Sequence, residues 1–265
     1  MESGWALVRL LFLLISARTE ARNRGHQPVR MQPRIYNGIK TTVGSLGGVG
    51  IQLFYKRNLV CTATLLTPQH ILTAAHCFGN LKMSEFHVIG GKSWEFTGHD
   101  SNLKKNKLIK VRIHPKYAKE KFIADVAVAK IKYPLNNKNV GYAQICRSDL
   151  SPNDTLIAAG WGFEGGIWDE LKRKTFRMMK VSFVGMRDCQ KKLGGKLPPN
   201  IICAGGYNNQ TLCFGDSGGP LLLGLEVCGI NTWTFECGNN AKPDVYMDVR
   251  YYASFIEETI SDMGF

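Results

Sequence analysis

The stretch Gly215-Asp216-Ser217-Gly218-Gly219-Pro220 decides how the rest of the sequence is interpreted. Its glycines let the backbone bend sharply, so that the serine projects and neighbouring N–H groups converge on one point. Such N–H groups can stabilise a developing oxyanion, an effect often worth about 3 kcal/mol per donor. A serine hydroxyl is a poor nucleophile unless a base takes its proton. Alone, the stretch is also compatible with a Gly-rich turn that exposes a serine, so a base must be found elsewhere in the chain.

A base and an acid occur upstream in two further motifs. Thr73-Ala74-Ala75-His76-Cys77 sets a histidine beside a cysteine, directly after an apolar pair. Asp125 stands at the head of the apolar run 126–131. Taken separately, the histidine could be a packed structural residue and the aspartate a strand cap. Their occurrence together, in the order His76, Asp125, Ser217, favours a base, an orienting acid and a nucleophile.

With these residues the chain resembles the chymotrypsin/trypsin-like serine proteases, whose triad follows the same order along the sequence. The resemblance spans residues 35 to about 262 and includes the motifs TAAHC (73–77), DVAVAKI (125–131), GWG (160–162), CFGDSGGP (213–220) and KPDVY (242–246). It implies a serine endopeptidase in which Ser217 is the nucleophile and His76 is the general base, then the general acid. Asp125 would orient the imidazole. The N–H groups of Gly215 and Ser217 would form the oxyanion hole.

Short apolar or alternating runs between clusters of Gly, Pro, Asn and Asp predict an all-β fold of the sandwich or barrel type. The runs are 49–55, 86–89, 108–113, 126–131, 156–159, 178–184, 221–230 and 245–249. One helix is predicted, at the C-terminus, where apolar residues share a face. The resemblance implies two six-stranded antiparallel β-barrels, at about 35–145 and about 146–250, with the helix at about 251–262. The active site would lie in the cleft between the barrels, with His76 and Asp125 from the first and Ser217 from the second.

Residues 1–34 are expected to lie outside this fold. The apolar run 7–15 is too short for a membrane span and has the length of a signal-peptide core. Residues 1–21 are therefore predicted to be a signal peptide, with Ala17 and Ala21 as alternative marks of its cleavage site, although an N-terminal helix or anchor is the other interpretation. The Arg-rich segment 22–34 is interpreted as an activation propeptide, followed by the protease domain at 35–265. The eight cysteines, an even number, agree with a secreted, extracellular protein.

The junction between Arg34 and Ile35 resembles the family's activation site, with Tyr36 and Asn37 in place of the usual Val and Gly. The resemblance implies that cleavage after Arg34 frees an α-amino group on Ile35, which then pairs with Asp216. A buried carboxylate without a partner is costly, and a new cation offsets much of that cost. The chain is therefore expected to be made as a zymogen. The other interpretation of Arg34 is a bare surface residue in a basic tail.

The residues that the resemblance assigns to the primary specificity pocket depart from the trypsin pattern. They are Thr211, Leu212, Thr232, Trp233, Thr234 and Asp244. Thr211 replaces the aspartate at the base of trypsin pockets, whereas Asp244 stands where the family has a glycine. Either Asp244 carries the relocated negative charge and favours a basic P1 residue, or it is an outward, solvated turn residue and the pocket takes apolar or small residues. Thr234 replaces a glycine and should narrow the mouth, while Thr232 keeps a hydroxyl that could bond Asp125.

The cysteines and two sequons complete the candidate sites. The resemblance pairs Cys61 with Cys77, Cys189 with Cys203 and Cys213 with Cys237, and it leaves Cys146 and Cys228 as a fourth pair. Sequons for N-glycosylation begin at Asn153 and Asn209, and the polar turn around Asn153 favours the first. No metal site and no cofactor are expected, since a triad mechanism needs neither.

Composition limits the possible classes of protein. The 265-residue chain is 44% hydrophobic and 21% charged, which argues against a disordered chain, a collagen-like fibre or a coiled coil. The net charge is +13, and its basic residues gather at 104–121 and 172–180. These groups are interpreted as solvated faces, with a polyanion or an anionic surface as the alternative partner, and no nucleic-acid fold signature accompanies them.

The expected partners are polypeptide substrates, an activating protease and a protein protease inhibitor, for a chain expected to be a monomer without a membrane span. The alternative function is a non-catalytic binding protein that keeps the protease fold and uses its basic surface.

Overall fold

The fold is described from a computed structural model. The structure describes residues 35, 38–95, 105–119, 123–152, 154–162, 174–206, 210–234, 237 and 242–264. The chain divides into a unit Met1–Met31 and a unit Gln32–Phe265. The expected signal peptide and propeptide, including Arg34, lie outside the described residues. None of the described helices is long and apolar enough to cross a membrane.

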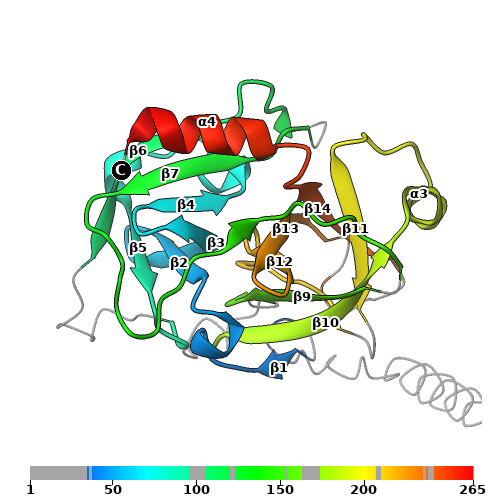
Figure 1. Cartoon of the computed structure of the whole chain (residues 1–265), viewed down its shortest axis with the longest axis horizontal. Coiled ribbons are helices and arrows are strands. Elements are labelled where there is room, and N and C mark those ends of the chain that lie inside the picture. Colours follow the sequence, from blue (N-terminus) through cyan, green and yellow to red (C-terminus); the bar gives the residue numbers. More distant parts are fainter. Residues whose placement is uncertain are drawn as a thin grey trace, which may run out of the picture. The chain divides into compact units, whose positions relative to one another are not determined.

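The first half of the described chain forms a closed antiparallel barrel with the strand order β2-β3-β4-β7-β6-β5 (Figure 1). Its strands are β2 (Gly50–Tyr55), β3 (Asn58–Thr67), β4 (His70–Thr73), β5 (Phe86–Gly90), β6 (Asn106–Ile113) and β7 (Ala127–Ile131). Branched apolar side chains such as Ile51, Leu65 and Val128 are completely buried within it. β-branched residues pack well on a pleated, buried surface, which explains why these short runs are strands.

A second closed barrel follows, with the strand order β10-β11-β14-β13-β12-β9 and closure between β9 and β10. Its strands are β9 (Thr155–Gly160), β10 (Arg177–Val184), β11 (Ile201–Gly206), β12 (Pro220–Leu223), β13 (Glu226–Trp233) and β14 (Asp244–Asp248). Its core includes Leu156, Val181 and Tyr246, and the buried Ile35 belongs to the same cluster. The prediction of two six-stranded antiparallel barrels is confirmed.

Two short strands attach to the second barrel at its margins. β1 (Ile39–Lys40) pairs with β10, although residues 35–145 were assigned to the first barrel on sequence grounds. β8 (Gln144–Ile145) pairs with β13 in a parallel arrangement. Both ends of the first-barrel segment are therefore fastened to the other barrel.

Two α-helices lie in the described part of the chain. The predicted C-terminal helix is α4 (Ala253–Met263), which packs beside β7 through its buried face (Figure 1). The Lys130 ammonium donates to the carbonyls of Met263 and Gly264 at 2.9 and 2.7 Å, which satisfies orphan acceptors at the helix end. The second helix, α3 (Met186–Leu193), was not predicted from the sequence. Its apolar residues Met186, Cys189 and Leu193 share one face that packs against the core, but three apolar positions in eight residues are too few to indicate a helix from the sequence.

Short 3₁₀ turns at Gly44–Leu46, Ala75–Cys77 and Met83–Glu85 complete the regular structure of the described residues.

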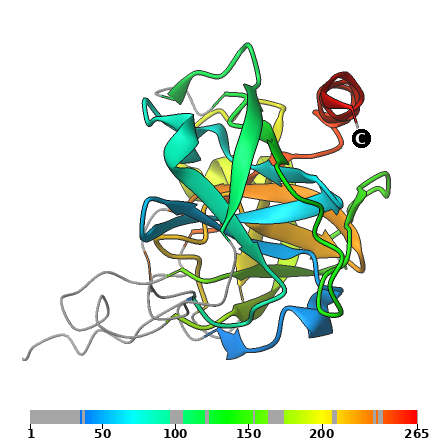
Figure 2. The ribbon, with the colours of Figure 1, turned by 90° about the vertical axis from the view of Figure 1, so that its left-hand side faces the viewer.

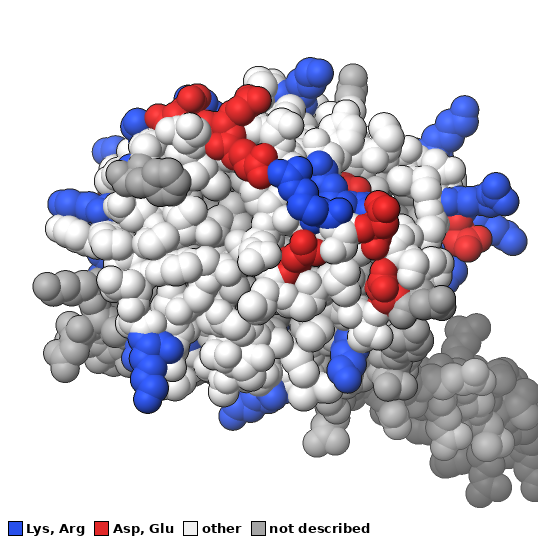
Figure 3. Space-filling model, in the orientation of Figure 1, with Lys and Arg blue, Asp and Glu red and all other residues white. Residues whose placement is uncertain are grey.

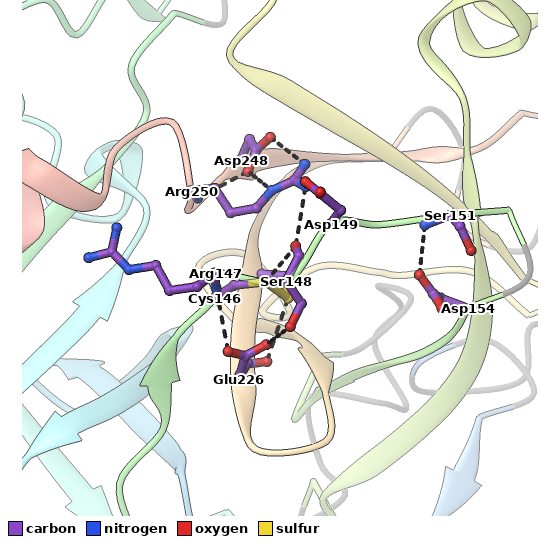
Figure 4. Close-up of polar contacts among 10 residues, drawn as sticks. Cys146, Arg147, Ser148, Asp149, Ser151, Asp154, Glu226, Asp248 and Arg250 are labelled. Atoms are coloured by element: carbon purple, nitrogen blue, oxygen red, sulfur yellow. Dashed lines mark hydrogen bonds and ion pairs between the residues drawn. A yellow bond between two sulfur atoms is a disulfide. The ribbon is translucent and has the colours of Figure 1, made fainter.

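All eight cysteines form disulfides, and the four expected pairs are confirmed: Cys61–Cys77, Cys146–Cys228, Cys189–Cys203 and Cys213–Cys237. Polar contacts surround the second of these pairs (Figure 4). The Ser148 hydroxyl donates to Glu226 at 2.6 Å, and the Arg250 guanidinium bonds both the Ser148 carbonyl and Asp248. The connector between the barrels is thus held to the second barrel by a covalent bond and by hydrogen bonds together.

We expect the double variant Cys146→Ser/Cys228→Ser to fold but to lose up to about 4 kcal/mol of unfolding free energy. The disulfide closes a loop with a sequence separation of 82 residues, and its loss frees the unfolded chain. Denaturant unfolding under non-reducing conditions measures the change. A midpoint equal to that of the wild type would show that the surrounding hydrogen bonds suffice without the bridge.

Candidate active site

His76 is held where the first barrel meets the loop 213–219, which carries Ser217 and is called the serine loop below. It lies in the 3₁₀ turn Ala75–Cys77, whose other two residues are buried, and the Cys61–Cys77 bridge ties that turn to β3. Its Nδ1 is 2.6 Å from Asp125 Oδ2, and its backbone N–H donates to Asp125 Oδ1 at 2.7 Å. Because an ionised carboxylate only accepts hydrogen bonds, Nδ1 carries the proton and Nε2 is left as an acceptor. The His76 side chain is 26% exposed and that of Asp125 is 7% exposed.

Asp125 owes its position to an unusual backbone conformation just before β7. Ala124 has a φ of +51°, in the left-handed region that a non-glycine residue rarely adopts. The Ala124 N–H donates to the Tyr252 hydroxyl, which also accepts from Asn200 at 2.5 Å. The bend that aims the carboxylate at His76 is therefore stabilised by residues from the second barrel and the start of the C-terminal helix.

The serine loop docks on β3 through Thr62. The Thr62 N–H donates to the Ser217 carbonyl at 2.9 Å, and the Thr62 hydroxyl donates to the Gly215 carbonyl at 3.0 Å. Thr73, three residues before His76, donates in turn to the Thr62 carbonyl at 2.9 Å. The structure therefore holds the loop that carries Ser217 against β3, and holds β3 to the strand that leads to His76, through a threonine that no sequence motif singled out.

Close packing explains the glycine at position 218. Its φ is +77°, and an added Cβ would lie 2.0 Å from Thr73 Oγ1 and 2.5 Å from the Thr62 carbonyl oxygen. In the described part of the chain, the Ser217 hydroxyl and the N–H groups of Gly215 and Ser217 have no hydrogen-bond partner. Donors left open beside a hydroxyl are the arrangement that an incoming carbonyl oxygen requires. Because catalytic hydrogen bonds often tighten only when substrate binds, the protein without substrate does not need a Ser217–His76 hydrogen bond.

Asp216 is completely buried beside the serine. Its carboxylate accepts from the N–H groups of Gly162 at 2.8 Å and Cys213 at 2.9 Å. Burial raises the pKa of Asp216 to about 7, against the lowering effect of these two hydrogen bonds, and the neighbouring Asp244 raises it further. Added Cβ atoms at Gly160 and Gly162 would lie 2.2 and 2.3 Å from the carboxylate, which gives the GWG motif a physical reason.

The predicted specificity residues lie mostly inside the protein. Thr211, Leu212, Thr232 and Asp244 are all buried, and Trp233 and Thr234 are partly buried. Asp244 is 3% exposed and belongs to β14, so the structure does not support a solvated turn residue. It accepts hydrogen bonds from the Leu212 N–H at 3.3 Å and from the Thr234 side chain. The Thr232 hydroxyl bonds the Val245 and Ile230 carbonyls, so the expected bond to Asp125 is wrong.

Tyr246 adds a third titratable group beneath these residues. It is completely buried, and its hydroxyl has no hydrogen-bond partner among the described residues. Burial, followed by the charges of Asp244 and Asp216, raises its pKa well above the usual value. Asp216, Asp244 and Tyr246 therefore form one buried cluster in which adding negative charge is costly.

Among the described residues, two groups of side chains come close enough together to share a metal ion: Cys61, His76, Cys77 and Cys146, Glu226, Cys228. In both groups the sulfurs belong to a disulfide. A disulfide sulfur has no thiolate to offer, so neither group fits a metal. Asn153 and Asn209 lie outside the described residues.

Comparisons with known proteins agree with this geometry. The family model described as Trypsin matches residues 35–256. The chain is 30% identical to seminase of Drosophila melanogaster over 95% of the chain and 96% of that protein. It is 29% identical to trypsin-4 of Rattus norvegicus over 76% of the chain and 80% of that protein. The structure of neuropsin, a serine protease expressed in the limbic system of mouse brain, superposes with a TM-score of 0.73 at 25% identity, covering 84% of this chain and 98% of that one.

Replacing Asp244 with Asn should make the protein more stable at pH 8 but not at pH 4. Burial raises the pKa of Asp244 from 3.8 to about 6, so the folded state binds this proton more tightly than the unfolded state does. The wild type therefore loses unfolding free energy as the pH rises from about 4 to about 6, by about 3 kcal/mol for this group. Denaturant unfolding across this pH range measures the difference between the two proteins.

The matched control is Glu258→Gln, which removes an exposed carboxylate that forms no ion pair among the described residues. The difference in unfolding free energy between this variant and the wild type should not change with pH. A difference for Asp244→Asn that is equally constant from pH 4 to pH 8 would contradict the assignment of a costly buried charge.

Proposed function

Because the chain belongs to the trypsin family of serine proteases, we propose that it is a secreted endopeptidase, made as a zymogen, that cleaves peptide bonds through an acyl-enzyme on Ser217. The observation that carries this proposal is the 2.6 Å contact between His76 Nδ1 and Asp125 Oδ2, beside a serine loop held by Thr62. This contact leaves His76 Nε2 free to take a proton. The four disulfides fit an extracellular protein.

The proposed reaction proceeds in two halves. Ser217 Oγ attacks the carbonyl carbon while His76 Nε2 takes its proton, and Asp125 stabilises the imidazolium. The N–H groups of Gly215 and Ser217 bind the oxyanion of the tetrahedral intermediate. His76 then gives the proton to the leaving amine, and the acyl-enzyme remains. Water, deprotonated by His76, attacks the acyl-enzyme; the bond to Ser217 Oγ then breaks, His76 returns the proton to Oγ, and the acid is released.

Activation would follow from cleavage after Arg34. The new α-amino group of Ile35 would supply a cation to Asp216, whose raised pKa reflects a carboxylate without one. The complete burial of the Ile35 side chain in the second-barrel core supports this role. A bound amine would favour the ionised carboxylate and fix the loop that carries the oxyanion donors.

The P1 preference stays open between two classes. A basic P1 side chain would give the buried Asp244 a counter-ion. A small or apolar P1 side chain would instead suit a pocket in which the Thr234 side chain and the Leu212 N–H already donate hydrogen bonds to the Asp244 carboxylate.

The other proposed partners are polypeptide substrates, an activating protease and a protein inhibitor, for a monomer. Glycosylation is proposed at Asn153 or Asn209. The binding-protein alternative gains no support from the site, because the base and its orienting acid are paired.

Cleavage of a peptide library by protein processed after Arg34 tests the activity and reads the P1 preference. Ser217→Ala should lower kcat by about 10⁴-fold or more, because the attacking oxygen is gone. A phosphonate that labels active serines should modify the wild type and not this variant. Ser254→Ala, which changes an exposed serine on α4, serves as the control. Equal cleavage by Ser217→Ala and the wild type would overturn the proposal.

Arg34→Gln tests activation. The variant should stay uncleaved in the presence of a trypsin-like activator and turn over substrate about 10²-fold more slowly or worse, the loss that follows removal of one oxyanion donor. Arg30→Gln, which changes a neighbouring arginine, should behave as the wild type. Activity of uncleaved Arg34→Gln equal to that of processed enzyme would show that no activation switch exists.

A further inference from the structure

The residue before Asp125 has a backbone conformation that an alanine does not favour. Ala124 is buried and has a φ of +51°, a region in which glycine meets no steric penalty but a Cβ does. Its carbonyl accepts from the Val126 N–H at 2.8 Å, which closes a tight turn around Asp125. A residue in such a conformation persists only where its surroundings hold it there. The direction of the Asp125 side chain therefore depends on the contacts that hold Ala124.

The Tyr252 hydroxyl supplies one of these contacts. It accepts a hydrogen bond from the Ala124 N–H and a second one, at 2.5 Å, from the side-chain amide of Asn200. Both Tyr252 and Asn200 are buried. Burial raises the pKa of Tyr252 to about 12, and the charge of Asp125 adds to the increase. The hydroxyl is therefore neutral at pH 7 and lies close enough to Asp125 to respond to its charge.

Asn200 fastens the hydroxyl to the second barrel. The Asp248 N–H, at the end of β14, donates to the Asn200 carbonyl at 3.0 Å, and β11 begins at the next residue, Ile201. Asn200 is thus fixed between two strands of that barrel. Through Asn200 and Tyr252, the backbone beside Asp125 is connected to the barrel that carries the serine loop.

The inner side of the C-terminal helix fixes the Tyr252 ring. Tyr252 directly precedes α4, which follows the second barrel but runs along β7 of the first, and Figure 2 shows this helix end-on at the margin of the barrels. The rings of Tyr252 and Phe255 pack edge-on against His114, with centroids 5.2 and 4.6 Å apart. The His114 N–H donates in turn to the Val126 carbonyl at 3.0 Å. The ring therefore packs on the residue that pairs with the tight turn.

The outer side of the same helix is acidic. In Figure 3, which has the orientation of Figure 1, acidic side chains gather along the course of α4, whose exposed acids are Glu257, Glu258 and Asp262. Asp262 pairs with Arg112 of β6 at 2.6 Å, and Glu257 pairs with Arg147 of the connector between the barrels. The helix is thus held by apolar packing on one side and by ion pairs on the other, which sets the position of the tyrosine at its start.

We propose that Tyr252 is a positioning residue for the proposed protease reaction: its hydroxyl keeps Ala124 in the left-handed conformation and thereby directs the Asp125 carboxylate at His76. Tyr252 acts through Ala124 and is not a catalytic residue. The inference rests on the proposed function, and it adds that docking of the C-terminal helix contributes to catalysis although α4 carries no member of the triad.

Kinetics of processed enzyme test the proposal. Tyr252→Phe removes the hydroxyl and keeps the ring that packs on His114. Its kcat per active site should fall about 10- to 100-fold, the cost of a small misplacement, because both halves of the reaction use His76 as Asp125 holds it. KM should stay within about twofold. Titration of active serines with the phosphonate counts the active sites, so a misfolded fraction does not enter kcat.

Tyr251→Phe is the matched control, because it removes a hydroxyl from the neighbouring tyrosine, whose side chain is 62% exposed. Its kcat should equal that of the wild type. A kcat of Tyr252→Phe within about twofold of this control would overturn the proposal.

A glycine at position 124 separates positioning from a merely structural role. Glycine adopts a positive φ without steric cost, so the turn needs the tyrosine less. The loss of kcat caused by Tyr252→Phe should shrink to about threefold or less when it is measured in the background of Ala124→Gly. An equal loss in both backgrounds would mean that the hydroxyl does not act through Ala124, which would contradict the proposal.

Proton NMR of the chain labelled with ¹⁵N-histidine gives a readout that needs no turnover. The proton between His76 Nδ1 and Asp125 Oδ2, which are 2.6 Å apart, should resonate far downfield in the wild type and in Tyr251→Phe. The resonance should be lost or move upfield in Tyr252→Phe and return when Ala124→Gly is added. An unchanged resonance in Tyr252→Phe would overturn the proposal. If processed enzyme cleaves no peptide, the proposed function fails, while this resonance still decides whether Tyr252 positions Asp125.

Denaturant unfolding shows whether Tyr252→Phe folds. If it does not fold, Asn200→Ser replaces it, because this change removes the other hydrogen bond of the hydroxyl and leaves the ring in place. A lower kcat at unchanged KM is again expected, and an unchanged kcat would overturn the proposal.

Discussion

The hydrogen bonds of Thr62 fix the relative position of two chemical groups that belong to different barrels. His76 depends on the first barrel and its disulfide, whereas Ser217 depends on a loop that leads into β12 of the second. One threonine uses its N–H and its hydroxyl on the serine loop and offers its carbonyl to Thr73. Because both bonds to the serine loop start from one residue, a shift of one barrel against the other would break them together, while the Thr73 bond holds Thr62 within the first barrel. Geometry that catalysis needs to within fractions of an ångström is thus set by short-range contacts.

Buried negative charge is the second constraint on the site. The charge of Asp244 raises the pKa of Asp216, and both charges raise the pKa of Tyr246, whose hydroxyl has no hydrogen-bond partner among the described residues. Backbone N–H groups reduce the cost without removing it. Groups held in this way respond strongly to an added cation, since its attraction acts through a medium that screens poorly. In the proposed activation and in the binding of a basic P1 residue alike, an added cation would reduce the cost of this buried negative charge.

The two six-stranded barrels that the resemblance implied are confirmed. His76 and Asp125 stand in separate short motifs and are paired in the structure, whereas the catalytic roles of these residues and of Ser217 stay predictions. The helix at Met186–Leu193 escaped prediction because it is short and has only three apolar positions, and β1 escaped because two residues show no periodicity. The role of Thr62 lay outside the reach of sequence, since a buried threonine in an apolar strand looks the same whether or not it bridges to another loop. Asp244 was ambiguous because residue type alone does not say which face of a strand is buried.

β1 has a consequence for how the proposed activating amine would be delivered. Only residues 36–38 separate Ile35 from β1, which is hydrogen-bonded to β10, and the Ile35 carbonyl already accepts from the Gly38 N–H at 2.6 Å. After cleavage behind Arg34, the new α-amino end would stay within about 14 Å of β1, which is the length of the fully extended intervening chain. Such a tether corresponds to an effective concentration of about millimolar or above. The amine would then act as an intramolecular ligand, so that the extent of activation depends on the number of cut chains and is insensitive to their dilution.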